Sequence, residues 1–325
     1  MSVVERHEPV WEGRRNAWRA GALTALRLAR AEVRLARRLH GEFDAVLVGY
    51  PGHLDVLALR RALPDVPLIL NPLVSLSDTL VGDRARFRPG SLPARRLCAV
   101  DRRAFAAADV VVADTHAHAE LFASLGARGV EVVPVGAEER VFHPPWQPAA
   151  ARRVLFVGKL IPLHGLETIL GAAATLPDVQ FRVIGEGQLD KTLRGRPANV
   201  EWIRWVEYEL LGNEYRAAGC ALGIFGTSAK AARERLVGLV RDHACGTPLV
   251  TADTPAAREL LADGESARLV PAGNSEALVD AVRRLLADEG AAWRLADGGL
   301  RTYRAQASED VLAPRWREVV ARVVR

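Results

Sequence analysis

Lysine is scarce in this chain of 325 residues, and its cationic side chains are almost all arginines. Only three of the 44 are lysines, namely Lys159, Lys191 and Lys230. The net charge of +5 and the pI near 9.5 therefore accompany a composition rich in alanine and arginine, which indicates codon bias. Zinc-finger spacings and aromatic RNA-binding patterns are missing as well, so the sequence predicts no nucleic-acid partner.

Cysteine is nearly absent too. Cys98, Cys220 and Cys245 are far apart, odd in number and without a CxxC pair. This spacing excludes a disulfide framework and a cysteine-based metal site. We expect all three to be small buried apolar side chains, and we predict no metal site.

Long hydrophobic runs are also missing. No window reaches the roughly 18 uncharged apolar residues that a membrane span needs. The first residues, MSVVERHEPVWEG, lack the apolar core of a secretory signal, so the sequence predicts a cytoplasmic protein. Hydrophobic residues make up 49% and charged residues 26% of the chain, which is typical of a globular protein with a core and excludes global disorder.

Short apolar runs alternate with helical patterns along the whole chain. Each run is rich in Val, Ile and Leu and is followed by Gly or Asp and then by an amphipathic stretch, as in βα units of a parallel sheet buried on both faces. The runs occupy residues 45–50, 67–71, 109–114, 130–136, 153–160, 181–187, 221–226 and 247–253. Since one domain usually has roughly 100–200 residues, we predict an α/β fold of two doubly wound, Rossmann-like parallel-sheet domains.

Three prolines within residues 141–153 separate the two series of strands. We therefore place the first domain at residues 1–148, the second at 149–308, and a C-terminal helix at 309–325. This helix has an apolar side that we expect to pack back on the body of the protein, formed by Trp316, Val319, Val320 and Val323.

The start of the chain lacks the strand and Gly-rich turn that normally open a doubly wound domain. Residues 2–11, SVVERHEPVW, lead directly into a helical stretch at about 15–40. The first domain is therefore predicted to be incomplete, without its first βα unit. The strand at 45–50 would then lie at an open edge, so we expect it to pair with residues 2–7 or to form a homo-oligomer.

One face of the helical stretch at 27–38 is basic. A basic amphipathic helix binds an anionic lipid surface or a phosphorylated ligand, so peripheral membrane contact is one expectation. A solvated arginine face is the alternative, because arginine is abundant everywhere in the chain. The face consists of Arg27, Arg30, Arg34, Arg37 and Arg38.

Ligands of open α/β sheets bind beyond the carboxyl ends of the strands. The loop from Gly158 to Gly165 follows one strand and brings Lys159 and His164 to the start of a helix near Leu166. Cationic groups beside free helix N–H groups suit a diphosphate, although a surface lysine with a capping histidine is the plain alternative.

Two further strand ends carry candidate binding residues. Gly185, in a short GxG, permits close approach of a ligand, but a tight turn explains it equally well. The loop after residues 221–226 is more informative, because its cluster fits an anionic or polyhydroxyl ligand. That cluster consists of Thr227, Ser228, Lys230 and Arg233.

Several segments in this order carry a family resemblance. VLFVGKLIPLHGLETILGAAA, VIGEGQ, GIFGTS and HACGTPLVTADTPAARELL resemble the nucleotide-sugar half of family 4 retaining glycosyltransferases. GYPGHLDV, LNPLVSLSDT and VVPVGAEERVF resemble the first, acceptor-side domain of one bacterial branch. The resemblance implies the GT-B architecture and metal-independent transfer from a nucleotide diphosphate sugar, with no other cofactor and an unknown acceptor.

The resemblance also implies roles for individual residues. Lys159 and His164 fall on the two positions that hold the donor diphosphate, next to Gly158. His53, in GYPGHLD, falls near the histidine that approaches the transferred sugar. A structural histidine at a strand-to-helix turn is the alternative for His53.

The chain departs from the family at two glutamates. An ungapped alignment puts Arg233 and Arg241 there, whereas Glu234 and Asp242 lie one residue further on, turned by about 100° around a helix. Such a pocket would hold an anionic ligand better than a neutral one. The alternative function is therefore a catalytically degenerate GT-B protein that binds a nucleotide, an anionic ligand or a partner enzyme without turnover.

Overall fold

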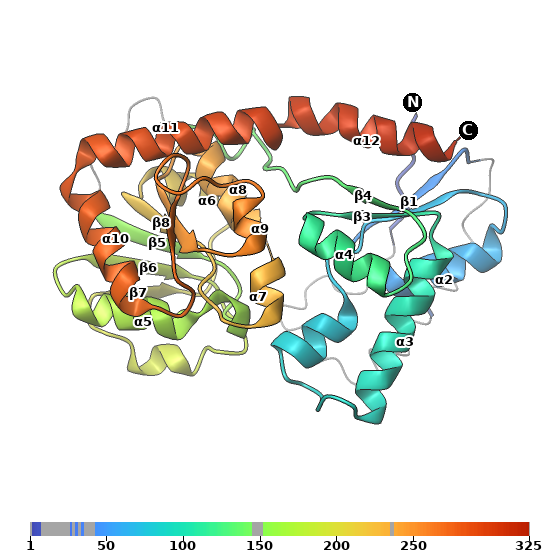
Figure 1. Ribbon diagram of the computed structural model, residues 1–325, viewed down its shortest axis with the longest axis horizontal. Coiled ribbons are helices and arrows are strands. Elements are labelled where there is room, and N and C mark those ends of the chain that lie inside the picture. The colour runs from blue at the N-terminus through green and yellow to red at the C-terminus, as the bar shows by residue number, and fades with distance from the viewer. Residues whose placement is uncertain are drawn as a thin grey trace.

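The computed structural model describes residues 2–7, 27, 30–31, 34–35, 43–144, 152–234 and 237–324. Two parallel sheets divide this part of the chain into two α/β units, domain 1 and domain 2 (Figure 1). The predicted fold class is confirmed. The predicted boundary at residue 148 lies outside the described residues.

Domain 1 contains a four-stranded sheet in the order β1-β2-β3-β4. Its strands are β1 (Val46–Val48), β2 (Leu68–Leu70), β3 (Val110–Ala113) and β4 (Val130–Val132). Its helices are α2 (His53–Ala62), the π-helix η2 (Asp78–Asp83), α3 (Leu92–Ala107) and α4 (His116–Ser124).

Alternation along the strands sends side chains to both faces of this sheet. Leu68 and Leu70 pack with α2, α3 and α4, whereas Ile69 between them points to the opposite face. Val111 and Val112 divide in the same way. Both faces are therefore buried, as the continuous apolar runs predict.

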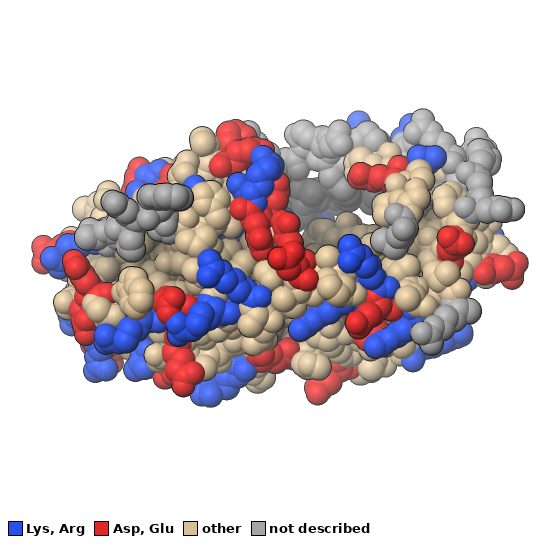
Figure 2. All heavy atoms as spheres, turned by 90° about the horizontal axis from the view of Figure 1, so that it is seen from above, with Lys and Arg blue, Asp and Glu red and all other residues tan. Residues whose placement is uncertain are grey.

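The second face of this sheet is covered by the C-terminal helix α12 (Glu309–Val323). Leu312 and Val319 are buried there against Ile69, Val112 and Val133. Helix α11 (Glu289–Gln306) lies on domain 2, and α11 and α12 together run along one side of both domains (Figure 1). On that side, acidic and basic residues among those described are interspersed (Figure 2).

Domain 2 contains a six-stranded sheet in the order β10-β9-β8-β5-β6-β7. Its strands are β5 (Arg153–Val157), β6 (Gln180–Ile184), β7 (Val200–Ile203), β8 (Cys220–Leu222), β9 (Leu249–Ala252) and β10 (Arg268–Val270). Its helices, besides α11, are η3 (Pro162–His164), α5 (Leu166–Thr175), η4 (Thr192–Gly195), α6 (Tyr208–Arg216), α7 (Ala229–Arg233), α8 (Val237–Ala244), α9 (Pro255–Arg258) and α10 (Ser275–Ala287).

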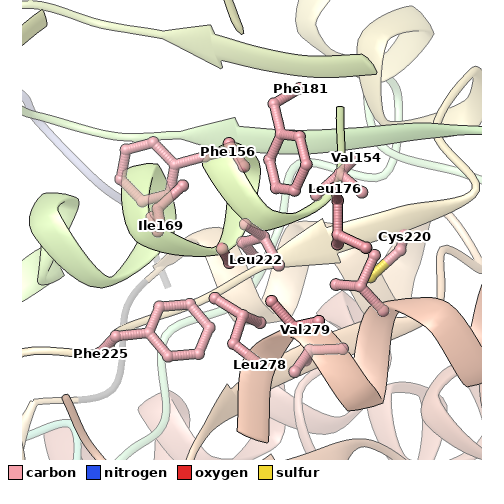
Figure 3. Close-up of a cluster of buried hydrophobic side chains, with 14 of the residues drawn as sticks. Val154, Phe156, Ile169, Leu176, Phe181, Cys220, Leu222, Phe225, Leu278 and Val279 are labelled. Carbon is pink, nitrogen blue, oxygen red and sulfur yellow. The ribbon is translucent and has the colours of Figure 1, made fainter. Parts of the chain in front are cut away.

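The core of domain 2 also lies on both sides of its sheet. Phe156, Phe181 and Leu222 pack on one side with residues of α5 and α10 (Figure 3). Leu155 and Ala221 point to the other side, towards α6, α8 and α11. Both sides of the sheet thus lie away from water, and only the loops at the strand ends remain for ligand binding.

Two cysteines meet the expectation and one does not. Cys220 and Cys245 are buried, and all three thiols are free. Cys98 is only half-buried, because it lies on the flank of the amphipathic helix α3 rather than in the core. The expectation of three buried cysteines is therefore wrong for Cys98.

The edge of the domain 1 sheet at β1 is not paired with residues 2–7, as one expectation had it. Among the described residues, β1 pairs only with β2, and residues 2–7 form no strand. Val3 and Val4 are exposed, and as neighbours they would point to opposite faces of a strand, which gives the segment no apolar side. Pairing of β1 by residues 2–7 is therefore wrong, and association of two chains through this edge stays a prediction.

The basic helical stretch is described in part. Arg27, Arg30 and Arg34 are helical and exposed, whereas Arg37 and Arg38 lie outside the described residues. No helix in the described ranges has the length and apolar character to cross a bilayer. Peripheral membrane contact stays a prediction.

The packing of α12 on domain 1 can be tested by Leu312→Ala. Removing this buried side chain should lower the free energy of unfolding by about 2–4 kcal/mol, because the surrounding side chains cannot fully close the cavity. Arg317→Ala on the exposed side of the same helix should change it by less than about 0.5 kcal/mol. Urea unfolding measures both, and equal effects would show that α12 does not form part of the core.

Candidate functional site

The loops after β5 and β8 meet at the carboxyl ends of the domain 2 sheet. Phe225 N donates to His164 O at 3.1 Å, and Gly226 N donates to Leu163 O at 3.0 Å. Gly165 has φ +65°, and a Cβ there would lie 2.5 Å from the carbonyl carbon of Phe225. Glycine thus permits the close contact that brings the Lys159 loop beside α7, which carries Lys230 and Arg233.

Lys159 lies on the open side of this loop. Its side chain is exposed, and no ion pair is found for it within the described ranges. Nearby protein atoms lower its pKa by desolvation, and the positive charge of Arg84 lowers it further. A lysine without a carboxylate partner beside the start of α5 is suited to bind an anion.

His164 is buried beside Lys159. Its Nδ1 contacts the carbonyl oxygen of Lys159, and since a carbonyl only accepts, Nδ1 must carry the proton. Burial lowers the pKa of His164 to about 4, and the charges of Arg84 and Lys159 act in the same direction. At neutral pH the ring is therefore uncharged, and Nε2, which has no hydrogen-bond partner among the described residues, is an acceptor.

Gly158 and Gly185 pack against each other. Gly185 has φ +141°, and a Cβ there would lie 1.9 Å from Gly158 O. A Cβ on Gly158 would lie 3.0 Å from Cε1 of His164. The tight-turn alternative accounts for Gly185 directly, and ligand binding by these glycines stays a prediction.

The cluster after β8 is largely committed to protein contacts. Ser228 caps α7 by accepting from Ala231 N at 3.1 Å, and Thr227 is exposed at the edge of the loop. Lys230 is buried and pairs with Glu234 at 2.7 Å. Lys230 is thus a structural cation of the interface with domain 1.

The two arginines at the family's glutamate positions lie apart. Arg233 Nη2 contacts Asp78 Oδ1 of domain 1 at 2.6 Å, so its charge is compensated across the interface. Arg241 has its guanidinium 4.8 Å from the ring centre of Phe142 and 5.3 Å from that of Tyr208. The expectation that Arg233 and Arg241 together make a pocket suited to an anionic ligand is therefore wrong for Arg233, because Asp78 of the other domain compensates its charge.

The two carboxylates next to these arginines do not form a pair either. Glu234 is bound to Lys230, and Asp242 is buried inside domain 2. Burial raises the pKa of Asp242 well above its usual value, which the positive charge of Arg241 partly offsets. The predicted loss of the carboxylate pair agrees with these separate surroundings.

Domain 1 contributes η2 and the next residue, Arg84, to the region near the Lys159 loop. The sequence did not predict a role for either of them. Asp83 is buried, and its carboxylate lies 3.2 Å from Arg84 Nε. Desolvation raises the pKa of Asp83, and the charges of Arg84 and Lys230 partly offset this. The available signal was the polar segment SDTLVGDR after the strand at 67–71, which places these side chains at a carboxyl end of the sheet.

His53 lies at the start of α2 and is buried. Its Nδ1 is 2.5 Å from Pro51 O, and its Nε2 is 3.2 Å from Asp101 Oδ1. Asp101 also accepts hydrogen bonds from the hydroxyl of Ser75 and from the hydroxyl and backbone N–H of Ser77, which precede η2. Both ring nitrogens of His53 thus face protein oxygens, as the structural alternative predicts, and contact with a sugar stays a prediction.

Further contacts hold the two domains together. Glu259, at the end of α9, accepts from His116 N at 2.8 Å and from Ala117 N at 3.0 Å, at the first turn of α4. Thr115 Oγ1 donates to Arg233 O at 3.2 Å. The described residues therefore form a closed arrangement in which domain 1 faces the Lys159 loop.

A separate cavity lies at the other end of the domain 2 sheet, away from the Lys159 loop. Its volume is about 920 Å³, and it lies at the amino ends of β5, β8 and β9, where Arg152, Gly219, Thr247 and Trp293 border it. Within the described residues, no group of three or more His, Cys, Asp or Glu side chains could hold a metal ion. The convergence of Lys159, His164 and Arg84 is therefore the candidate site.

Comparison with known proteins identifies domain 2. Residues 151–288 match the family model described as glycosyl transferases group 1. Domain 2 is a group 1 glycosyltransferase domain. The predicted family resemblance is thereby confirmed for this half of the chain.

Curated relatives extend the match beyond domain 2. Phosphatidyl-myo-inositol mannosyltransferase of Mycobacterium leprae is 31% identical over 188 residues, which is 55% of this chain and 46% of that protein. D-inositol 3-phosphate glycosyltransferase of Xylanimonas cellulosilytica is 28% identical over 311 residues, covering 83% of this chain and 70% of the relative. The chain spans about half the length of the first of these relatives.

Solved structures show the architecture. Sucrose-phosphate synthase from Thermosynechococcus elongatus has a TM-score of 0.73 at 18% identity, covering 93% of this chain and 78% of that one. Anabaena HepE in complex with UDP-glucose has a TM-score of 0.71 at 18% identity, covering 91% and 83%. At such low identity the likeness concerns the fold, and the two-domain arrangement is the GT-B fold.

Gly185→Ala tests the contact between the two glycine turns. The new Cβ would overlap Gly158 O and oppose a positive φ, so we expect a loss of about 3 kcal/mol or more in the free energy of unfolding. Gly195→Ala, where nothing lies within 4 Å, should change it by less than about 0.5 kcal/mol. Denaturant unfolding of both variants distinguishes packing from a purely ligand-related role, which would leave Gly185→Ala as stable as the control.

The buried state of His164 predicts a pH dependence of stability. The folded-state pKa is about 4 and the unfolded value about 6.5, so between these limits the unfolded chain binds the extra proton. Stability should therefore fall as the pH decreases from about 6.5 towards 4. Relative to His164→Gln, wild type should lose about 2–3 kcal/mol by pH 4.5, measured by urea unfolding. Parallel pH profiles of the two proteins would contradict this.

Proposed function

We propose that the protein is a retaining, metal-independent glycosyltransferase that moves a sugar from a nucleotide diphosphate sugar to an acceptor that is still unknown. The observation that carries the proposal is Lys159, which forms no ion pair with a described residue and lies beside His164, just ahead of α5, in a group 1 glycosyltransferase domain. This arrangement suits the diphosphate of a donor.

Electrostatic stabilisation would be the main contribution of the protein. As the bond between the sugar C1 and the phosphate oxygen breaks, negative charge develops on the leaving diphosphate, and Lys159 would stabilise it. The new bond between C1 and the acceptor oxygen would form on the same face of the sugar. The leaving phosphate would then accept the acceptor proton, so that no separate protein base is needed.

His164 would change its protonation on donor binding. In the neutral ring Nε2 can only accept a hydrogen bond, because Nδ1–H donates to Lys159 O. An anion beside it favours the imidazolium form, which donates from both ring nitrogens. His164 would therefore act as a donor to phosphate only after taking up a proton.

The solved neighbours support the nucleotide class without fixing it. Anabaena HepE is described in complex with UDP, with UDP and glucose, and with UDP-glucose. We propose a nucleoside diphosphate sugar for this chain on that likeness and on Lys159. The cytoplasmic location expected from the sequence stays a prediction.

Activity with a panel of nucleotide sugars tests the function, with Lys159→Ala and Lys191→Ala as a matched pair. Removing one preorganised cation near the leaving group should lower kcat/KM by about 100-fold or more, equivalent to about 3 kcal/mol of transition-state stabilisation. Lys191 is exposed at the start of η4, outside the candidate site, so its variant should retain wild-type activity.

Other results would point elsewhere. Equal activity of the two lysine variants would remove Lys159 from the site. Nucleoside diphosphate binding by calorimetry without transfer or hydrolysis of any donor would favour the alternative, a GT-B protein that binds without turnover. Absence of both binding and turnover would contradict both functions.

A further inference from the structure

Arg84 belongs to domain 1, yet it acts on the Lys159 loop of domain 2. Its positive charge lowers the pKa of both Lys159 and His164. The side chain is only 17% exposed, and burial lowers its own pKa, although the negative charges of Asp83 and Glu234 act in the opposite direction. Contacts of the neighbouring turn agree with this. Gln188 donates to the carbonyl oxygen of Arg84, and the next residue, Leu189, donates its N–H to Leu160 O at 2.9 Å, directly after Lys159. Arg84 therefore lies near the two residues that the resemblance assigns to the donor diphosphate, on the opposite side of the interface.

Contacts on both domains fix the position of Arg84. Asp83 lies 3.2 Å from its Nε, and Gln188 of domain 2 donates to its carbonyl oxygen at 3.2 Å. The ion pair of Asp78 with Arg233 holds the other end of η2 against α7. An arginine held in this way presents its guanidinium without a large loss of side-chain entropy on binding.

The terminal nitrogens of Arg84 remain available. Its ion pair with Asp83 uses Nε, and no hydrogen bond from Nη1 or Nη2 is found within the described ranges. Of the nearby acids, Glu234 pairs with Lys230, and Asp83 lies next to Arg84 at Nε. A planar pair of N–H donors is suited to phosphate oxygens.

Arg84 of domain 1 and Lys159 of domain 2 thus lie near each other, and no carboxylate among the described residues forms an ion pair with both. The positive charges of Arg84 and Lys159 repel each other, and a multivalent anion between them would turn this repulsion into attraction to a common ligand. His164, whose buried Nε2 has no hydrogen-bond partner among the described residues, lies next to Lys159. The geometry favours a diphosphate over a monoanion, because a diphosphate has oxygens for both sides.

We propose that Arg84 binds the donor diphosphate from domain 1, opposite Lys159, so that the bound donor links the two domains. This rests on the proposed function, since it assigns a further residue to the same donor. Arg84 is then a binding residue, and Asp83 and Gln188 are positioning residues for it.

Calorimetric titration of the full chain with UDP, GDP and ADP, and with the corresponding nucleosides, tests the proposal. Arg84→Gln should weaken nucleoside diphosphate binding about 10- to 100-fold and change nucleoside binding less than twofold. Arg84→Lys keeps the charge but lacks the planar pair of donors, so it should recover only part of the affinity. Arg88→Gln, at an exposed position of the same segment, should bind like wild type.

Each alternative result has a distinct meaning. Wild-type diphosphate affinity in Arg84→Gln, with loss in Lys159→Gln, would overturn the proposal and leave the proposed function intact. Equal weakening of nucleoside and diphosphate would also overturn it, because it would indicate a general distortion. If wild type binds no nucleoside diphosphate, the proposed function itself fails. If Arg84→Gln unfolds at a clearly lower temperature, the binding data of Arg84→Lys decide whether the proposal holds. Undiminished diphosphate binding by Arg84→Lys would overturn the bidentate role.

Discussion

Asp101 lies on α3 without exposed surface, and its carboxylate accepts four hydrogen bonds from Ser75, Leu76 and Ser77. Burial alone would raise its pKa, but the hydrogen bonds from His53 and from both serines hold the pKa below its usual value. A buried carboxylate deprived of such partners would be strongly unfavourable. The turn at residues 75–77 is thereby fixed to the core of domain 1, and η2 and Arg84 continue directly from it towards domain 2.

The need of buried charged groups for partners also explains where the two domains contact each other. Charged groups that leave water at this interface need partners, and the partners come from the opposite domain: Asp78 for Arg233, and the Glu259 carboxylate for the first turn of α4. Arginine at position 233 therefore does not simply reverse the charge of a donor pocket. It forms part of the contact that places η2, and with it Arg84, over the Lys159 loop.

Much of the fold followed from local sequence pattern. The apolar runs predicted the parallel sheets because each run is buried on both faces, as Leu68 and Ile69 show. The strand-end rule also located the Lys159 loop. The place of Arg84 opposite the Lys159 loop and the Asp78–Arg233 ion pair could not be predicted in this way. The aspartate and the arginine are 155 positions apart, and no local pattern shows which loops will face each other. His53 was ambiguous for the same reason, since its partner Asp101 lies on a different helix.

Arg84 also gives a physical reason for histidine at position 164. The family resemblance puts a diphosphate-binding position there. A buried lysine at this position would have to remain charged in a desolvated place near the positive charges of Arg84 and Lys159, or lose its proton. Histidine avoids this conflict, because burial keeps its ring neutral at neutral pH and Nδ1–H donates to Lys159 O. It can still become positive when an anion compensates Arg84 and Lys159, so the charge of the site adapts to its occupancy.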